Sequence, residues 1–132
     1  MQGMAYPPTP NTGVTRTLWK LTGADMNSVA DQAFVKQFGF TQYRITGIWI
    51  TNASATLAAT LKTLAVRTAT GGGGTAIVNA QNLTALITSA NMLVCTLLNS
   101  DVRSDAALYA LLSAGTGVAA TCDIYIDGIA LS

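Results

Sequence analysis

The side chains that most often carry acid–base and nucleophilic catalysis are missing from this sequence. It contains no histidine and no glutamate. Ser-His-Asp and Cys-His nucleophile systems therefore cannot be assembled from it, and neither can a metal site built on histidine. The groups left for proton transfer are aspartates, lysines and tyrosines. This inventory predicts a protein that is not an enzyme and that needs no cofactor.

Asp123 and Asp127 are the closest acidic pair that one strand face would carry. Four strand residues separate their Cα atoms by roughly 13 Å. This exceeds the gap of about 6.5–9.5 Å between the two carboxylates of an inverting glycosidase. We therefore interpret both as solvent-facing strand residues. Asp101 and Asp105 flank a short turn without the regular oxygen ligands of a calcium loop, so we expect turn and cap roles for them.

Four consecutive glycines, residues 71–74, invite comparison with a phosphate-binding loop. Such a loop continues with Lys-Ser or Lys-Thr and a helix, whereas the residues that follow here, Thr75 to Val78, have strand composition. The glycines are therefore predicted to form a flexible hairpin connection. Its tip, Gly72 and Gly73, is a candidate contact with a neighbouring subunit.

The two cysteines and the two tryptophans have simple interpretations. Cys95 and Cys122 lie in apolar runs, which predicts buried free thiols, with a disulfide as the alternative. Trp49 lies in an apolar segment and is expected in the core. Trp19 follows Arg16 closely and is either a core residue or an interface anchor, because Trp and Arg are both enriched at binding hot spots. Arg16 and Trp19 are therefore interface candidates.

The composition places limits on the partners of the chain. Its 132 residues suit one domain, and only 10% of them are charged, against about a quarter in average globular proteins. Such low charge fits a surface that is partly covered by other subunits. The net charge of +1 offers no basic patch for nucleic acid. No apolar run approaches the roughly 20 residues of a membrane helix, and the first residues do not resemble a signal peptide.

The first thirteen residues differ from the rest of the chain. Prolines at three positions exclude a helix or a central strand there. Residues 1–13 are predicted to be an extended arm, with a disordered tail as the alternative. The arm would be suited to clamp a neighbouring subunit, and its interface candidates are Tyr6, Pro7, Pro8 and Pro10.

Residues 14–132 are predicted to form a single all-β domain. Several short segments are rich in β-branched and aromatic residues, and turn signals separate them, which indicates an antiparallel sandwich or barrel. The predicted strands are Thr15–Leu21, Tyr43–Thr51, Leu61–Ala69, Thr75–Val78, Met92–Leu98 and Thr121–Ile129.

Two segments fit this pattern less well, and together they allow at most one short helix. Asn79 to Ile87 is predicted to be a helical turn that covers one end of the sandwich. Ser104 to Ala114 has helical composition with a capping serine, yet Tyr109 and Leu111 also fit one face of a strand.

The chain from Tyr43 onward resembles the small head-decoration, or cement, proteins of tailed bacteriophages. The likeness begins with the strand and turn from Tyr43 to Leu57. It continues in Gly-Gly-Thr-Ala-Ile-Val (73–78), the apolar strand Met92 to Leu98, Leu-Tyr-Ala-Leu (108–111) and Ala-Thr-Cys-Asp-Ile-Tyr-Ile-Asp-Gly (120–128). These segments consist of common residues and contain no catalytic signature.

The resemblance implies a jelly-roll-like antiparallel β-sandwich, with Leu108 to Ser113 as a strand. It implies a virion protein, made in the host bacterial cytoplasm, that binds the major capsid protein on the outer surface of the head. Such proteins act as homodimers or homotrimers that bridge capsomers and stabilise the shell against internal pressure.

Two other virion roles remain as alternatives. A receptor- or carbohydrate-binding module would need an exposed aromatic platform with polar partners, for which the candidates are Trp19, Tyr125 and Asp123. A head–tail joining or tail structural protein is the second alternative, and copy number per particle would distinguish it.

Overall fold

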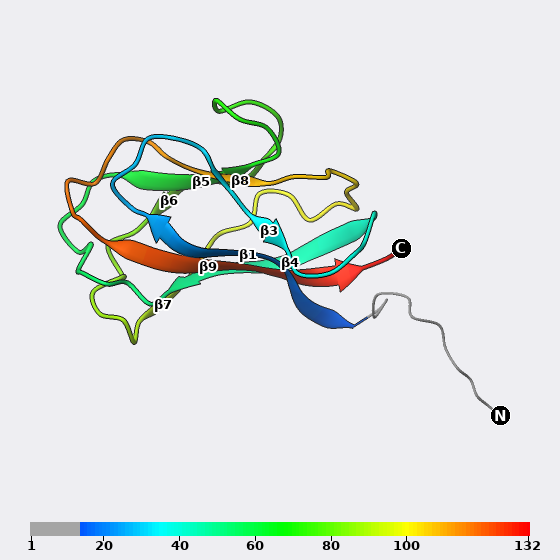
Figure 1. The fold of residues 1–132 in the computed structure, drawn as a ribbon, viewed down its shortest axis with the longest axis horizontal. Helices are drawn as coiled ribbons and strands as arrows, with labels where there is room; N and C mark the ends of the chain where they lie inside the picture. The colour runs from blue at the N-terminus through cyan, green and yellow to red at the C-terminus, as the bar shows by residue number, and fades with distance from the viewer. Residues whose placement is uncertain (1–13) are drawn as a thin grey trace.

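A computed structural model describes residues 14–132 as two antiparallel β-sheets packed face to face (Figure 1). These residues contain nine strands and no helix. The all-β sandwich predicted from the sequence is therefore confirmed. The predicted arm, with Tyr6 and the three prolines at positions 7, 8 and 10, lies outside the described residues.

The five-stranded sheet has the order β3-β1-β9-β4-β7, and the four-stranded sheet has the order β2-β8-β5-β6. Their bounds are β1 Thr15–Asp25, β2 Gln32–Ala33, β3 Val35–Lys36, β4 Tyr43–Thr51, β5 Thr63–Arg67, β6 Ala76–Asn82, β7 Met92–Val94, β8 Tyr109–Leu112 and β9 Thr121–Ala130.

The strand pairing is that of a rolled-up long hairpin. β1 pairs with β9, β2 with β8, β4 with β7, and β5 with β6, all antiparallel. Eight strands nested in this way and folded over into two sheets form a jelly roll. The two-residue strand β3 adds one short edge to the first sheet.

The core lies between the two sheets and is built from strand residues that alternate in and out. In β9, Cys122, Ile124 and Ile126 point inward, whereas Asp123 and Tyr125 point outward, as the sequence predicts. The core also contains three buried aromatic side chains that pack edge-on against one another, namely Trp19, Phe40 and Tyr43.

β1 and β4 each have a bulge where they pair with β9, the central strand of the five-stranded sheet. The register between β1 and β9 shifts between Thr17 and Trp19, and that between β4 and β9 shifts between Ile45 and Gly47. A bulge lets consecutive residues point to the same side. This is why Leu18 and Trp19 are both buried although they are neighbours in β1.

The predicted helical turn at 79–87 is wrong. β6 continues to Asn82, and a turn then follows in which Leu86 N donates to Leu83 O at 3.1 Å. The ambiguous segment 104–114 contains strand β8 and no helix. β8 lies between β2 and β5, so ladders on both sides outweigh its local helix propensity.

Candidate protein-binding interface

The two flanks of the sandwich, where each sheet ends, are built differently. At one flank a single segment, residues 32–36, contributes β2 to one sheet and β3 to the other. Both strands are two residues long, and Lys36 lies in β3 with its ammonium donating to Phe40 O at 2.8 Å. Very short edge strands that carry a charge are a common protection against edge-to-edge association.

The opposite flank carries no charge. It is formed by β6 and β7, the last strands of their sheets. The chain from Thr68 to Ser100 contains no charged residue at all. We call residues 76–98 the open flank. Four of the ten exposed large apolar side chains in the described chain belong to it, and they are Ile87 (52% exposed), Met92 (59%), Val94 (62%) and Leu98 (59%).

Only one of the two edge strands on the open flank is free. The outer edge of β6 is covered by the segment after β7, because Leu98 N donates to Ile77 O at 2.8 Å. In addition, Thr96 N donates to the side chain of Gln81 at 2.9 Å. No other strand of residues 14–132 pairs with the outer edge of β7. The open flank therefore offers one uncovered strand edge beside its apolar side chains.

An ordered row of side chains crosses the outer face of the five-stranded sheet and ends at β7. Lys20, Tyr125, Trp49 and Val94 are direct neighbours on β1, β9, β4 and β7. The rings of Trp49 and Tyr125 are stacked, with centroids 4.2 Å apart and planes 15° apart. Lys20 Nζ lies 5.0 Å from the centroid of Tyr125. We call Lys20, Tyr125 and Trp49 the aromatic column.

Asp127 holds the aromatic column in place by accepting a hydrogen bond from Trp49. Its two carboxylate oxygens accept hydrogen bonds at 2.9 Å from Thr17 Oγ1 and from Trp49 Nε1. A tryptophan whose ring is already held in place loses little conformational entropy when a partner covers it. The column therefore extends the open flank with a rigid aromatic surface of the kind enriched in protein interfaces.

The core position predicted for Trp49 is wrong, because its side chain is on the outer face and only half-buried. The physical reason is the β4 bulge. Tyr43 and Ile45 point inward before it, and Ile48 and Ile50 point inward after it, so Trp49 points outward. The change of phase in the apolar pattern at Thr46-Gly47 is visible in the sequence and could have revealed this.

Trp19 has the opposite outcome to Trp49. It is only 2% exposed, and its ring packs edge-on against Phe40 and Tyr43. Of the two alternatives for Trp19, the core position is therefore confirmed and the role as an interface anchor is wrong. Arg16 is half-buried on β1, with its guanidinium carbon 4.0 Å from the centroid of Phe38. Arg16 and Trp19 do not form a joint anchor.

The glycine tract forms the hairpin between β5 and β6, as predicted. Gly71, Gly72 and Gly74 have φ values of 66°, 75° and 67°, which other residues rarely adopt. The tip is held by a hydrogen bond of 3.0 Å from Gly71 N to Asp31 Oδ2. Gly72 is exposed and Gly73 is half-buried, and neither belongs to the open flank.

The platform considered for carbohydrate, Trp19 with Tyr125 and Asp123, is not assembled. Trp19 is buried, and one face of the Tyr125 ring is covered by Trp49. The Asp123 carboxylate accepts hydrogen bonds from Gly23 N and Asn52 Nδ2, at 2.9 and 3.1 Å. Its oxygens thus hold the last part of β1 and the residue that follows β4.

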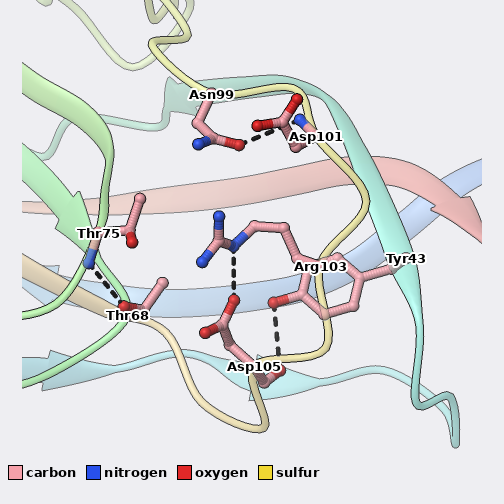
Figure 2. A network of polar contacts seen from close by, with 7 residues as sticks. All are labelled: Tyr43, Thr68, Thr75, Asn99, Asp101, Arg103 and Asp105. Atoms are coloured by element: carbon pink, nitrogen blue, oxygen red, sulfur yellow. Dashed lines mark hydrogen bonds and ion pairs between the residues drawn. The ribbon is translucent and has the colours of Figure 1, made fainter.

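The ionisable groups around Tyr43, at the start of β4, form a structural network (Figure 2). Arg103 Nε donates to Asp105 Oδ2 at 2.5 Å, and the Tyr43 hydroxyl donates to Asp105 O at 3.1 Å. Burial and the nearby Asp105 charge raise the pKa of Tyr43, and the hydrogen bond to Asp105 raises that of Arg103. Asp101 N bonds to Asn99 Oδ1 in the same loop. These contacts attach the loop after β7 to the start of β4.

The predicted free thiols are confirmed, since Cys95 and Cys122 are both buried and unpaired. Burial raises the pKa of the Cys95 thiol to about 12. Burial, with a smaller effect of the Asp123 charge, raises that of Cys122 to about 11. Neither sulfur is therefore a thiolate near neutral pH, which is the form that nucleophilic chemistry requires.

Other kinds of site have little to support them in residues 14–132. This part of the chain brings together no group of three His, Cys, Asp or Glu side chains that could hold a metal ion. It also contains no helix with the length and apolar character needed to cross a membrane. A shallow depression on the outer face of the four-stranded sheet, beside Arg67 and Leu111, has Arg67 as its sole charged lining residue.

No family model, curated protein or solved structure matches the chain. Its function is therefore inferred from the open flank and the aromatic column.

Proposed function

We propose that this protein is a virion structural protein, a decoration or cement protein that binds the outer surface of a phage head and stabilises contacts between capsid subunits. The observation that carries the proposal is the open flank. It combines an uncovered strand edge, exposed apolar side chains and a run of 33 residues, Thr68 to Ser100, without a charge. Surfaces of this kind are typical of proteins that are permanently covered by a partner.

The energetics of the open flank suit a protein that acts in many copies. Complete burial of one large aliphatic side chain contributes about 1.5–3 kcal/mol relative to full exposure. The four side chains of the flank are already partly covered, so each retains a fraction of this amount. Repetition over a shell multiplies a modest contact, because linked sites can exceed single-site affinity by about 10²–10⁴.

The proposal names its partners. These are the major capsid protein and further copies of the chain, in the form of a homodimer or homotrimer. The protein would be made in the host bacterial cytoplasm and would act on the outer capsid surface. It would require no cofactor and would perform no catalysis. A net charge of +1, with the charged residues spread over several strands, supports a surface that avoids nucleic acid.

Cryo-EM of the virion that contains this chain is the test. We expect several hundred copies in a regular lattice on the outer shell. A handful of copies at one vertex or on the tail would replace this proposal with a head–tail joining or receptor-binding role. Absence from the particle would overturn the virion assignment.

Matched variants test whether the open flank makes the contact. Ile87→Lys and Leu98→Lys place a charge on it and are expected to lower occupancy on purified heads at least tenfold. Val35→Lys is the control, because Val35 is 62% exposed on the opposite flank. Equal occupancy of all three variants would exclude the open flank as the capsid-binding surface.

A further inference from the structure

We propose that β7 pairs with β7 of a second copy across a twofold axis, which joins two five-stranded sheets into one sheet of ten strands. This inference deepens the proposed function and rests on it in one respect, since the second copy would occupy part of the open flank. The dimer itself requires no capsid and can be tested on the purified protein.

The outer edge of β7 presents backbone groups that have no partner strand within residues 14–132. Cys95 N donates to Ile48 O at 2.8 Å, so the main chain of Cys95 faces β4. In an antiparallel ladder alternate residues face the same neighbour. Leu93, which lies opposite Ile50, therefore also faces β4, while the N–H and C=O groups of Met92 and Val94 point away from it. No strand among residues 14–132 lies on that side.

The edge of β7 is complementary to itself. A twofold axis through Leu93 places Met92 of the first copy opposite Val94 of the second. It also places Val94 of the first copy opposite Met92 of the second. Each Met92–Val94 pair would exchange two N–H···O=C bonds, as hydrogen-bonded pairs in antiparallel sheets do. The two pairs together would satisfy the N–H and the C=O of both residues on both strands. Such a contact uses the same surface on each copy and closes after two subunits.

The side chains at this edge are apolar and exposed. Met92 and Val94 are 59% and 62% exposed, and they alternate with Leu93, which packs against the core. Across the axis they would form two apolar cross-strand pairs beside Trp49, the neighbour of Val94 on β4. β7 has no charge, proline or bulge that would oppose pairing, whereas β3 at the other edge of the same sheet carries Lys36.

Charge variants at the two facing positions provide the test. We expect purified wild-type protein to sediment as a dimer of its 13.6 kDa chain at high micromolar concentration. The double variant that combines Met92→Asp and Val94→Asp places two aspartate pairs across the axis. It should yield monomers, because like charges directly opposite repel. Met92→Lys with Val94→Asp introduces the same number of charges but places each lysine opposite an aspartate, and should remain dimeric.

The control Val35→Asp, at an equally exposed valine on the opposite flank, should sediment like the wild type. Monomeric or trimeric wild-type protein would overturn the inference. So would a dimer that persists in the double-aspartate variant, or identical behaviour of the two double variants. Failure of Leu98→Lys to lose capsid binding would count against the proposed capsid contact, and it would leave the dimer result unaffected.

Discussion

Trp49 and Tyr125 stack against each other from adjacent strands, with ring centroids 4.2 Å apart and planes 15° apart. Both side chains stand on the outer face of the five-stranded sheet, where solvent would otherwise surround them. Asp127 holds the indole through a 2.9 Å hydrogen bond to Nε1. The stacked pair is therefore a rigid part of the outer face that is already in place before any partner binds.

Removal of the Asp127 carboxylate should loosen this arrangement. Asp127→Ala deletes the acceptor of two hydrogen bonds, from Thr17 Oγ1 and Trp49 Nε1. Hydrogen bonds to a charged group contribute about 1.5–3 kcal/mol when well shielded, and the half-exposed site lowers this. We expect a loss of about 1–3 kcal/mol in the free energy of unfolding, measured by urea denaturation. Asp127→Asn keeps one acceptor and should fall between Asp127→Ala and the wild type; equal stability of all three would contradict this role.

Substitution of Gly128 should lower the free energy of unfolding strongly, whereas substitution of the nearby Gly47 should change it little. A Cβ on Gly128 would overlap Arg44 O and approach Leu18 Cδ1 to 2.7 Å, whereas a Cβ on Gly47 would meet nothing within 4 Å. Overpacking of a well-filled site costs typically about 1–3 kcal/mol, and contact with backbone raises this. Gly128→Ala is expected to lower the free energy of unfolding by at least about 3 kcal/mol.

Gly47→Ala is the matched control on β4, with a change within about 1 kcal/mol of the wild type. Thermal and urea unfolding of both variants would decide the matter. Similar effects of the two substitutions would show that the close approach at Gly128 is not the cause.

The two thiols should make the fold sensitive to alkali. Burial raises the pKa of Cys95 to about 12 and that of Cys122 to about 11, from an ordinary value of 9.0. Between pH 9 and these values the unfolded chain loses thiol protons that the folded chain keeps, so the free energy of unfolding falls as the pH rises. The contribution is fully present below about pH 8.

A series of urea melts from pH 7 to pH 11 would measure this. The variant with Cys95→Ala and Cys122→Ala should be less stable at pH 7 and should lose stability less steeply above pH 9. Rapid reaction of the native wild-type protein with a thiol-specific disulfide reagent at pH 8 would show that the sulfurs are not buried in solution.

The network around Tyr43 yields a smaller, more local prediction. Tyr43→Phe removes a hydroxyl that donates to Asp105 O at 3.1 Å and leaves that carbonyl without its partner. We expect a loss of about 1 kcal/mol in the free energy of unfolding. Tyr109→Phe is the comparison, because Tyr109 is half-buried on β8 and, within residues 14–132, Tyr43 is the tyrosine whose hydroxyl donates a hydrogen bond. An equal effect of the two substitutions would contradict a specific role for the Tyr43 contact.

Local pattern predicted β9 and the hairpin at residues 71–74 because each depends on residues close in sequence. β9 alternates without interruption from Cys122 to Ile126, and the glycines occupy φ values that suit them. The segment around Tyr109 required knowledge of its neighbours, since only the ladders from β2 and β5 make it a strand. Its local composition alone favours a helix.

The open flank could not have been located from local pattern. The sequence shows the uncharged run from Thr68 to Ser100, but edge positions depend on pairing between distant segments. β7, for instance, is an edge strand because β4 is its only partner among the strands of residues 14–132. The same dependence explains the error at Trp49 and the two alternatives left open at Trp19, since the exposure of both follows from bulges against β9.

The central place of β9 also governs the order in which the protein can fold during synthesis. β9 is the last of the strands in residues 14–132, yet it lies between β1 and β4 in the five-stranded sheet (Figure 1). That sheet cannot close until residues 121–130 have left the ribosome. Until then β1 and β4 lack their shared partner, and Ile48 and Ile50 have no complete core to enter. Such long-range pairing is slow, and nascent chains that wait for it are the ones that chaperones protect.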